Sequence, residues 1–563
     1  MTKISIQASC RLLPWLSLVV FLVSAIPGGG RQKPQKDDPS APAAASSDPV
    51  LQAMREELDR SKLQLKMDNV PAPYYIEYRL SDVDEYDAEA AFGALRQNQQ
   101  VHMRTLRVVV RVGDYKLDSY YGPGTGVVNL APLENEPTAL RRELWTATDR
   151  AYKSASEALA MKKALLSQYT ADQPFDDFAH APALQSIEPL AKLDFDPRPW
   201  KQSLEESTGL FRTDLKIQSL TAMVQFRAVN QYFLNTEGTV TRHGYTWHSV
   251  VISGLTQATD GMRLERGVYH ITPDIKELPT HDQFLAEMTS MIETLKALRE
   301  APLVEEDYRG PVLFSSDAAT DIFNGMIGEN VLGVRPKPGE SVRTEGDFAS
   351  SYKSRVLPAF LSVVDDPTIK TFQGKTLSGS YEFDDEGVRA AKVPLVQDGV
   401  LVNYLLGREP IRDFPESNGH GRAAPGQPPA PTKGTLLVQS KQSLSPAELK
   451  KKLIEICRQE GKPFGYYAET LAGYTPRLLY RVYETDGHEE LVRGAVFDEL
   501  DPRTLRNDLI AAGNDPLVSN REGMIPTTVI SPSILFDELE VKRTDAKNAK
   551  LPEYPPPDLT SHH

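Results

Sequence analysis

Residues 383–401 read FDDEGVRAAKVPLVQDGVL. The apolar and β-branched residues around 391–396 predict a strand, and the Asp-Glu-Gly and Asp-Gly segments beside them predict tight turns. Residues 379–383, just before this segment, are also predicted as a strand. Short strands joined by glycine-containing turns are typical of a β-rich domain.

The same pattern extends through the C-terminal half, from about Tyr308 to Arg543. Further strands are predicted at residues 311–315, 356–364, 435–439 and 478–483. Helices are predicted there only at residues 317–327 and 445–459. We therefore assign residues 304–543 to a β-rich C-terminal domain.

The helix at 445–459 also indicates how the cysteines are used. It opens with the segment Ser445-Pro446-Ala447-Glu448, a capping box with proline at the first helical position. Cys457 then shares one helix face with Leu449 and Leu453. The other cysteine, Cys10, lies within residues 1–30, predicted below to be a cleaved signal peptide, so only Cys457 would remain in the mature chain. We therefore expect no internal disulfide and a buried thiol at Cys457.

The N-terminal half mixes helix and strand signals. Helices are predicted from Asp48-Pro49, over residues 136–167, and from Thr280, with Gln283 completing a capping box, to just before Ala301. Strands are predicted at residues 105–112, 219–234, from Thr239 and at 247–255, with the turn Asn235–Gly238 between them. We assign residues 51–303 to a mixed α/β N-terminal domain, so the whole chain is predicted to be α+β.

The two ends of the chain differ from these domains. Residues 1–30 have a positively charged start, an apolar run from Leu12 to Ile26 and small residues after it, which predicts a secretory signal peptide. A retained N-terminal anchor is the alternative. We expect export, to the periplasm or outside the cell, with no transmembrane span after cleavage. Residues 31–50 are predicted to be a flexible linker and residues 544–563 a disordered tail.

Charge and histidine spacing exclude several functions. A net charge of −14 and a pI near 5.4 disfavour nucleic acid as a partner. The 10 histidines include no pair spaced as metal ligands on a helix. Residues 488–493, HEELVR, begin like a zinc-peptidase motif but lack the second histidine. Residues 122–126, GPGTG, lack the Gly-Lys-Ser/Thr of a phosphate loop. Spacing alone therefore predicts no metal site.

Residues 416–434 predict a long glycine- and proline-rich loop. Long loops in compact domains are usually functional or disordered. The glycines would let the backbone approach a ligand closely, and polar side chains beside them supply hydrogen-bond donors. We therefore predict a binding role for Asn418, Gly419, His420 and Arg422.

From Tyr308 to Arg543 the order of segments resembles the TldD/PmbA family, the U62 peptidases also described as modulators of DNA gyrase. The most specific match is FDDEGV at 383–388 followed by PLVQDGVL at 394–401. Similar segments in the family's order are Gly310–Ala319, Ser417–Arg422, Ala512–Asp515 and Ser531–Leu535, and Asn235–Gly238 resembles an N-terminal turn of the family.

In the catalytic branch of this family, a His-Glu-x-x-x-His motif and a later cysteine hold zinc, and the glutamate activates water. The positions that match them here are Asn324, Gly325, Glu329 and Ser519. The resemblance therefore implies a degenerate site with no zinc and no catalytic residue. It implies closest similarity to the PmbA branch, which lacks the motif and acts as the partner of a catalytic subunit.

Two functional hypotheses follow from this resemblance, beside a purely structural role. In the first, the chain is an exported, non-catalytic protein that binds an extended peptide, through the loop predicted above, or pairs with a catalytic TldD-like homologue in a homo- or heterodimer. In the second, it is an active metallopeptidase that uses relocated ligands suited to harder ions than zinc. The candidate relocated ligands are Asp321, Asn324, Glu329 and His420.

Overall fold

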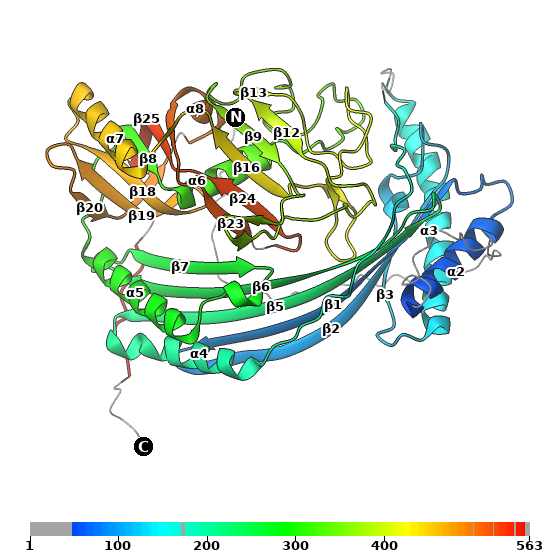
Figure 1. The fold of residues 1–563 in the computed structure, drawn as a ribbon, viewed down its shortest axis with the longest axis horizontal. Helices are drawn as coiled ribbons and strands as arrows, with labels where there is room; N and C mark the ends of the chain where they lie inside the picture. The colour runs from blue at the N-terminus through cyan, green and yellow to red at the C-terminus, as the bar shows by residue number, and fades with distance from the viewer. Residues whose placement is uncertain (1–47, 170–174, 499, 522, 545–547, 558–563) are drawn as a thin grey trace.

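The computed structural model describes residues 48–169, 175–498, 500–521, 523–544 and 548–557. Helices combine with several sheets, which confirms the predicted α+β class. A long curved sheet forms the N-terminal part, and the C-terminal part lies over its concave side (Figure 1). The predicted signal peptide and most of the predicted linker lie outside the described residues.

The N-terminal sheet has the strand order β3-β2-β1-β5-β6-β4, and β7 also pairs with β6. Its strands are β1 (Tyr75–Ala91), β2 (Ala94–Arg111), β3 (Val127–Leu130), β4 (Gln185–Ile187), β5 (Ile217–Asn235), β6 (Val240–Gln257) and β7 (Arg263–Thr272). The prediction of separate strands from Thr239 and at 247–255 was wrong, because β6 is continuous. The polar residue His243 between them faces the C-terminal domain, 3.7 Å from Asp385, and does not mark a turn.

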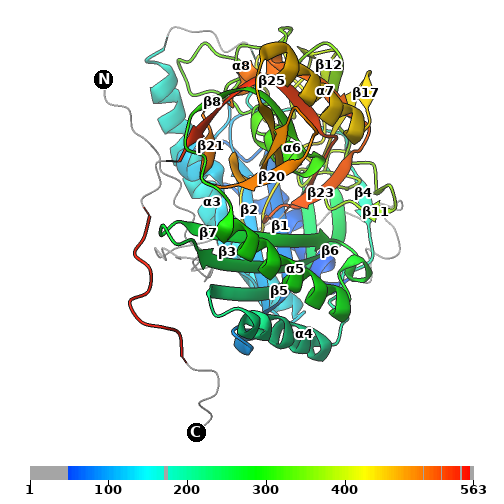
Figure 2. The same ribbon diagram turned by 90° about the vertical axis from the view of Figure 1, so that its left-hand side faces the viewer.

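Helices cover the convex face of this sheet. One end packs against α2 (Pro49–Gln64) and α3 (Pro137–Leu166), and the other against α4 (Pro197–Gly209) and α5 (His281–Glu300) (Figures 1 and 2). The predicted helices are confirmed, with Asp48 as the cap of α2 and the capping box of α5 in place, whereas α4 was not predicted.

Alternate residues of the sheet face opposite layers. In β1, Ile76 and Tyr78 pack in the core formed with α2 and α3. Arg79 lies on the other face, where its Nη2 donates to the carbonyl oxygen of Asp385 in the C-terminal domain at 2.8 Å. The odd-numbered residues of β1 therefore face the C-terminal domain.

The C-terminal part contains two larger sheets around one core. The first has the order β13-β12-β9-β16-β24-β23 and the second β17-β22-β25-β8-β18-β19-β20, with β21 pairing β25. Their strands are β8 (Tyr308–Phe314), β9 (Leu361–Asp365), β12 (Val393–Gln397), β13 (Val400–Leu401), β16 (Thr435–Ser440), β17 (Ser443–Leu444), β18 (Phe464–Ala472), β19 (Thr475–Tyr483), β20 (Glu489–Val492), β21 (Ala495–Phe497), β22 (Leu509–Gly513), β23 (Leu517–Arg521), β24 (Thr527–Ser531) and β25 (Ile534–Arg543). Two small hairpins are β10 (Thr371–Phe372) with β11 (Lys375–Thr376), and β14 (Gly421–Arg422) with β15 (Ala430–Pro431).

Among the described residues, the helices that accompany these sheets are α6 (Ser316–Phe323), α7 (Pro446–Glu460) and α8 (Pro502–Asn507). The capping box of α7 and the buried thiol of Cys457 are as predicted. The prediction of only two helices missed the short α8. Residues 379–383 form no strand, because they lead directly into a turn held by the side chain of Asp384.

The described part of the C-terminal tail, residues 548–557, forms no helix or strand. Ala549 nevertheless bonds to the N-terminal domain, because its backbone N–H donates to the carbonyl oxygen of Gly261 at 3.1 Å. No helix within the described residues has the length and apolar character needed to cross a membrane.

Candidate functional site

The first candidate site lies where α6 ends. Ser315 caps this helix by accepting a hydrogen bond from the backbone of Ala318 at 3.1 Å, and its hydroxyl donates to the carbonyl oxygen of Glu469 at 2.6 Å. Ile322 anchors the apolar side of the helix in the core. The chain then continues into a π-type turn at Asn324–Gly328, a distortion frequently found at functional sites.

The polar side of α6 is held by β23. Arg521 forms an ion pair with Asp321, and its Nη2 donates to the hydroxyl of Thr320 at 2.7 Å. Ser519 precedes Arg521 by two residues on β23, so its side chain lies on the same face of the strand, toward α6. The negative charge of Asp321 is therefore already matched by a guanidinium.

Neighbouring side chains also occupy the space around the π-type turn. The Tyr474 hydroxyl, from the tip of the β18–β19 hairpin, lies so close to Gly325 that an added β-carbon would meet it at well under 3.0 Å. The buried Lys433 forms an ion pair with Glu329. The Oδ1 atom of Asn324 is buried and has no hydrogen-bond partner among the described residues.

These residues do not assemble into a metal site. Within the described ranges, no group of three or more His, Cys, Asp or Glu residues is placed to hold a metal ion. Of the relocated-ligand candidates, Asp321 and Glu329 are engaged in ion pairs. His420 is directed instead to Asp365, with 3.1 Å between its Nε2 and Oδ1 of that carboxylate. The structure does not bring these side chains together around one point.

The second candidate site is the turn at residues 383–388, on the boundary between the domains. The carboxylate of Asp384 accepts hydrogen bonds from the backbone N–H groups of Glu386 at 3.0 Å, Val388 at 2.8 Å and Gly421 at 2.9 Å. Burial raises the pKa of Asp384 to about 6, with the charge of Asp385 adding to the effect and these hydrogen bonds opposing it. One carboxylate thus fixes both the turn and the start of β14.

Asp385 points toward the N-terminal sheet. Its Oδ2 accepts from Nε of Arg422 at 3.0 Å, and its backbone carbonyl accepts from Arg79. Burial would raise the pKa of this carboxyl, but the charges of Arg422, His243 and Arg79 outweigh burial and lower it. Asp385 is therefore held as a carboxylate between two guanidinium groups from different domains.

Glu386 is buried beside these charges. Its Oε2 accepts from the backbone N–H of Arg408 at 2.7 Å and passes so close to Gly407 and Gly421 that neither position has room for a β-carbon. Burial, and then the charge of Asp384, raise the pKa of Glu386 to about 8. This carboxyl therefore holds a proton near neutral pH.

Arg408 completes the boundary. Its guanidinium makes a two-point ion pair with Glu237 of the N-terminal turn, at 2.7 and 2.8 Å, and also donates to the carbonyl oxygen of Ala179. The Tyr115 hydroxyl donates to the same glutamate at 2.7 Å. Two-point pairs of this kind are strong and geometrically specific, so the boundary is a fixed contact between the domains.

The predicted binding residues lie inside this boundary. Asn418 bonds to the backbone of residues 404 and 406 through both atoms of its amide, at 2.8 Å each. Gly419 has a φ of +78° and lies against the backbone of residue 389, which leaves no room for a side chain. His420 and Arg422 are buried. Their bonds to Asp365 and Asp385 direct these side chains into the interior of the protein.

Sequence reasoning gave residues 383–388 no chemical role and missed Arg408 and Glu237. The available signal was the run of three acidic residues, Asp384 to Glu386, between apolar segments. Carboxylates buried together require counter-charges or protons, so such a run points to a polar network.

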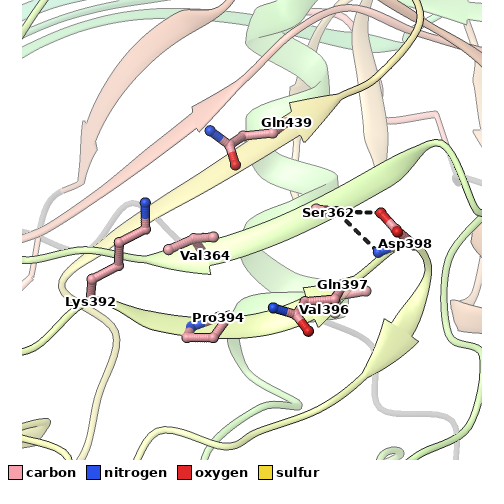
Figure 3. Close-up of a pocket in the computed structure, with 8 residues that line it drawn as sticks. All are labelled: Ser362, Val364, Lys392, Pro394, Val396, Gln397, Asp398 and Gln439. Carbon is pink, nitrogen blue, oxygen red and sulfur yellow. Dashed lines mark hydrogen bonds between the residues drawn. The ribbon is translucent and has the colours of Figure 1, made fainter.

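A separate hollow of about 670 Å³ lies on β9, β12 and β16 (Figure 3). Its lining includes Ser362, Lys392, Asp398 and Gln439. The Ser362 hydroxyl accepts from the backbone N–H of Asp398 at 3.1 Å, and the Asp398 carboxylate pairs with Lys441. This wide, shallow hollow brings together neither a nucleophile with a base nor a set of metal ligands.

Known proteins share sequence and fold with this chain. Residues 307–543 match the family model of the PmbA/TldA metallopeptidase C-terminal domain. A metalloprotease of Methanothermobacter thermautotrophicus is 35% identical over 105 residues, 18% of each chain. Metalloprotease PmbA of Escherichia coli O157:H7 is 28% identical over 191 residues, 33% of this chain and 38% of that protein. These alignments thus span well under half the length of the curated relatives.

Solved structures share the fold over a larger part of the chain. A modulator of DNA gyrase from Thermotoga maritima superposes with a TM-score of 0.57 and 15% identity, over 83% of this chain and 96% of that one. TldE from Thermococcus kodakarensis superposes with a TM-score of 0.53 and 12% identity, also over 83% of this chain and 96% of that one. Fold and sequence matches define a metallopeptidase-like protein. Through residues 307–543 the chain belongs to the TldD/PmbA family, and the solved structures share its fold.

Proposed function

We propose that this chain is a non-catalytic member of the family, exported to the periplasm or secreted, that binds an extended peptide or pairs with a catalytic homologue in a homo- or heterodimer. The observation that carries the proposal is the set of residues at the catalytic branch's zinc positions. Asn324, Gly325, Glu329 and Ser519 provide neither an imidazole nor a thiolate. This donor set does not fit the tetrahedral site that zinc prefers.

The surroundings of these positions support the same proposal. Lys433 and Arg521 place positive charges beside Glu329 and Asp321, where a bound cation would be repelled. Tyr474 covers Gly325, the position of the family's water-activating glutamate. These contacts count against the alternative of an active metallopeptidase with relocated ligands.

In this proposal the four loop residues support peptide binding indirectly. Arg422 bonds Asp385 in the turn at 383–388. Asn418 and His420 fix the loop that precedes Arg422 to the backbone of residue 406 and to Asp365, and Gly419 packs against the backbone of residue 389. They would thereby set the distance between the α6 region and the concave face of that sheet, the space in which an extended peptide would lie.

The test is metal content per chain, measured on protein purified from its native compartment, with peptide hydrolysis assayed in parallel. We expect no stoichiometric metal and no hydrolysis. A family member with an intact His-Glu-x-x-x-His motif, purified in the same way, is the positive control. One metal per chain with chelator-sensitive cleavage would overturn the proposal. Fractionation of cells tests export, and co-purification with a catalytic homologue tests pairing.

A further inference from the structure

The concave face of the N-terminal sheet carries a row of carboxylates that neither candidate site uses. Glu85, Asp87 and Glu89 are alternate residues of β1, so they share the face on which Arg79 contacts the C-terminal domain. The pairing of β1 with β5 is unbroken along this stretch, which fixes their orientation. In Figure 1 this part of β1 runs along the curved sheet beneath the C-terminal domain.

The two outer carboxylates have cationic partners. Glu85 accepts from Nε of Arg227 at 2.7 Å and from the amide of Gln225 at 2.9 Å. Glu89 pairs with Arg96 at 3.3 Å. Their charges are therefore compensated within the chain.

Asp87, between them, is different. It is 8% exposed, and no ion pair to it forms among the residues that the structure describes. Burial, and then the charge of Glu85, raise its pKa to about 6, while hydrogen bonds from Gln225 and Gln99 act in the opposite direction. A buried carboxylate without a counter-ion is unfavourable and would gain from a bound cation.

Two further polar side chains on the same face lack a hydrogen-bond partner within the described part of the chain. Ser249 lies opposite Gln225, and Trp247 opposite Arg227, in a stretch of the β5–β6 ladder that has no bulge. They are 1% and 2% exposed, and the Oγ of Ser249 and the Nε1 of Trp247 have no hydrogen-bond partner among the described residues. Buried polar groups usually have partners, so these atoms independently indicate a site that a ligand or water completes.

An entry path exists along β2. Gln99, the cross-strand neighbour of Asp87, is exposed, and so is Val101. The strand β3 pairs with β2 only over residues 105–108, so the preceding residues of β2 form an edge within the described part of the sheet. A long side chain can therefore reach Asp87 across Gln99.

We propose that this face is a subsite for a basic peptide side chain, with Asp87 as the direct counter-ion of its ammonium or guanidinium group. Such a cation matches the one carboxylate of the row that has no ion pair within the described chain. The inference rests on the proposed function and deepens it, because it names basic peptides as the ligand class.

The test compares two blocked heptapeptides of alanine whose central residue is lysine or norleucine, which differ in charge and hardly in shape. Titration near neutral pH should show the lysine peptide binding about tenfold more tightly. In Asp87→Asn this preference should disappear, while the affinity for the norleucine peptide stays unchanged. Glu345→Gln, at an exposed carboxylate, is the matched control and should keep the preference.

Each outcome bears on a different claim. Equal binding of the two peptides, or a lysine preference that survives Asp87→Asn, would overturn the subsite and leave peptide binding in place. Absence of binding by either peptide would overturn the peptide-binding part of the proposed function, and the subsite with it. Thermal unfolding of Asp87→Asn checks that this variant is folded, which we expect because the change removes a buried charge.

Discussion

The hydroxyl of Tyr474 lies against the backbone of Gly325, where the π-type turn leaves α6. Tyr474 is 38% exposed, so it covers the turn from outside and is not part of the core. The lack of a side chain at Gly325, the position that the resemblance matches to the catalytic branch's glutamate, makes room for the tyrosine. Glycine at this position is therefore part of the packing of the hairpin over α6.

The first prediction tests this contact. Gly325→Ala should lower the free energy of unfolding by about 1–3 kcal/mol, because the added methyl overpacks the contact with Tyr474. In a Tyr474→Ala background the same change should be neutral or stabilise by up to about 1 kcal/mol, since alanine is the better helix former. Denaturant unfolding of the four proteins in a double-mutant cycle measures the coupling.

The matched control is Gly209→Ala, at the end of α4, where an added β-carbon meets its nearest atom at an ordinary 3.5 Å. Gly209→Ala should change the free energy of unfolding by the same amount with Tyr474 and with Tyr474→Ala. Equal destabilisation by Gly325→Ala with and without Tyr474 would show that the tyrosine is not the cause.

The second prediction concerns pH. Because the pKa of Glu386 rises from an ordinary 4.5 to about 8 on folding, the folded chain binds this proton more tightly. The associated stability is complete below about pH 4.5 and is lost as the pH rises through about 8. Glu386→Gln keeps an acceptor for the Arg408 backbone and should remove this part of the decline. Thermal unfolding scans across the range measure the effect.

A smaller decline should persist at lower pH in Glu386→Gln, because Asp384 also has a raised pKa, of about 6. Glu345→Gln, at an exposed position, should leave the whole profile unchanged. If Glu386→Gln followed the wild-type curve up to pH 8, the proton would have to reside on another group.

Elements with local signals could be predicted from the sequence. The capping boxes at Thr280 and Ser445 depend on residues three positions apart, and both helices begin where predicted. The turn at Asn235–Gly238 was equally visible, because its side-chain hydrogen bonds are local. Here the sequence neighbours are also the physical partners.

The candidate sites depend on distant partners, which spacing does not reveal. Arg408 and Glu237 are 171 positions apart, and Tyr474 reaches Gly325 from the tip of the β18–β19 hairpin. The segment 418–422 was predicted to bind a ligand, with glycines that let the backbone approach it and polar side chains that donate hydrogen bonds. In the structure the glycines allow close packing within the chain, since Gly421 leaves room for the buried Glu386. A glycine-rich segment can serve either ligand approach or internal packing, and only the fold distinguishes these two uses.

The third prediction concerns the contact between the domains. Arg408→Lys keeps the charge but cannot reproduce the two-point pair with Glu237, so we expect a loss of about 1–3 kcal/mol. Arg412→Lys, which loses one exposed bond to a backbone carbonyl, is the control and should change little. Denaturant unfolding measures the loss, and limited proteolysis shows whether the domains separate. An unchanged midpoint for Arg408→Lys would mean that the pair adds no net stability.

The fourth prediction decides how Arg422 acts. Its guanidinium bonds Asp385 and lies 4.1 Å from the Tyr381 ring, so Arg422→Ala leaves a buried carboxylate without its main counter-ion. We expect a loss of about 3–5 kcal/mol, part of which Asp385→Asn should restore in the double variant by removing the buried charge. Denaturant midpoints and peptide titrations on the same preparations separate the two roles. Weaker peptide binding by an Arg422→Ala variant that unfolds at the wild-type midpoint would instead place Arg422 in direct contact with the peptide.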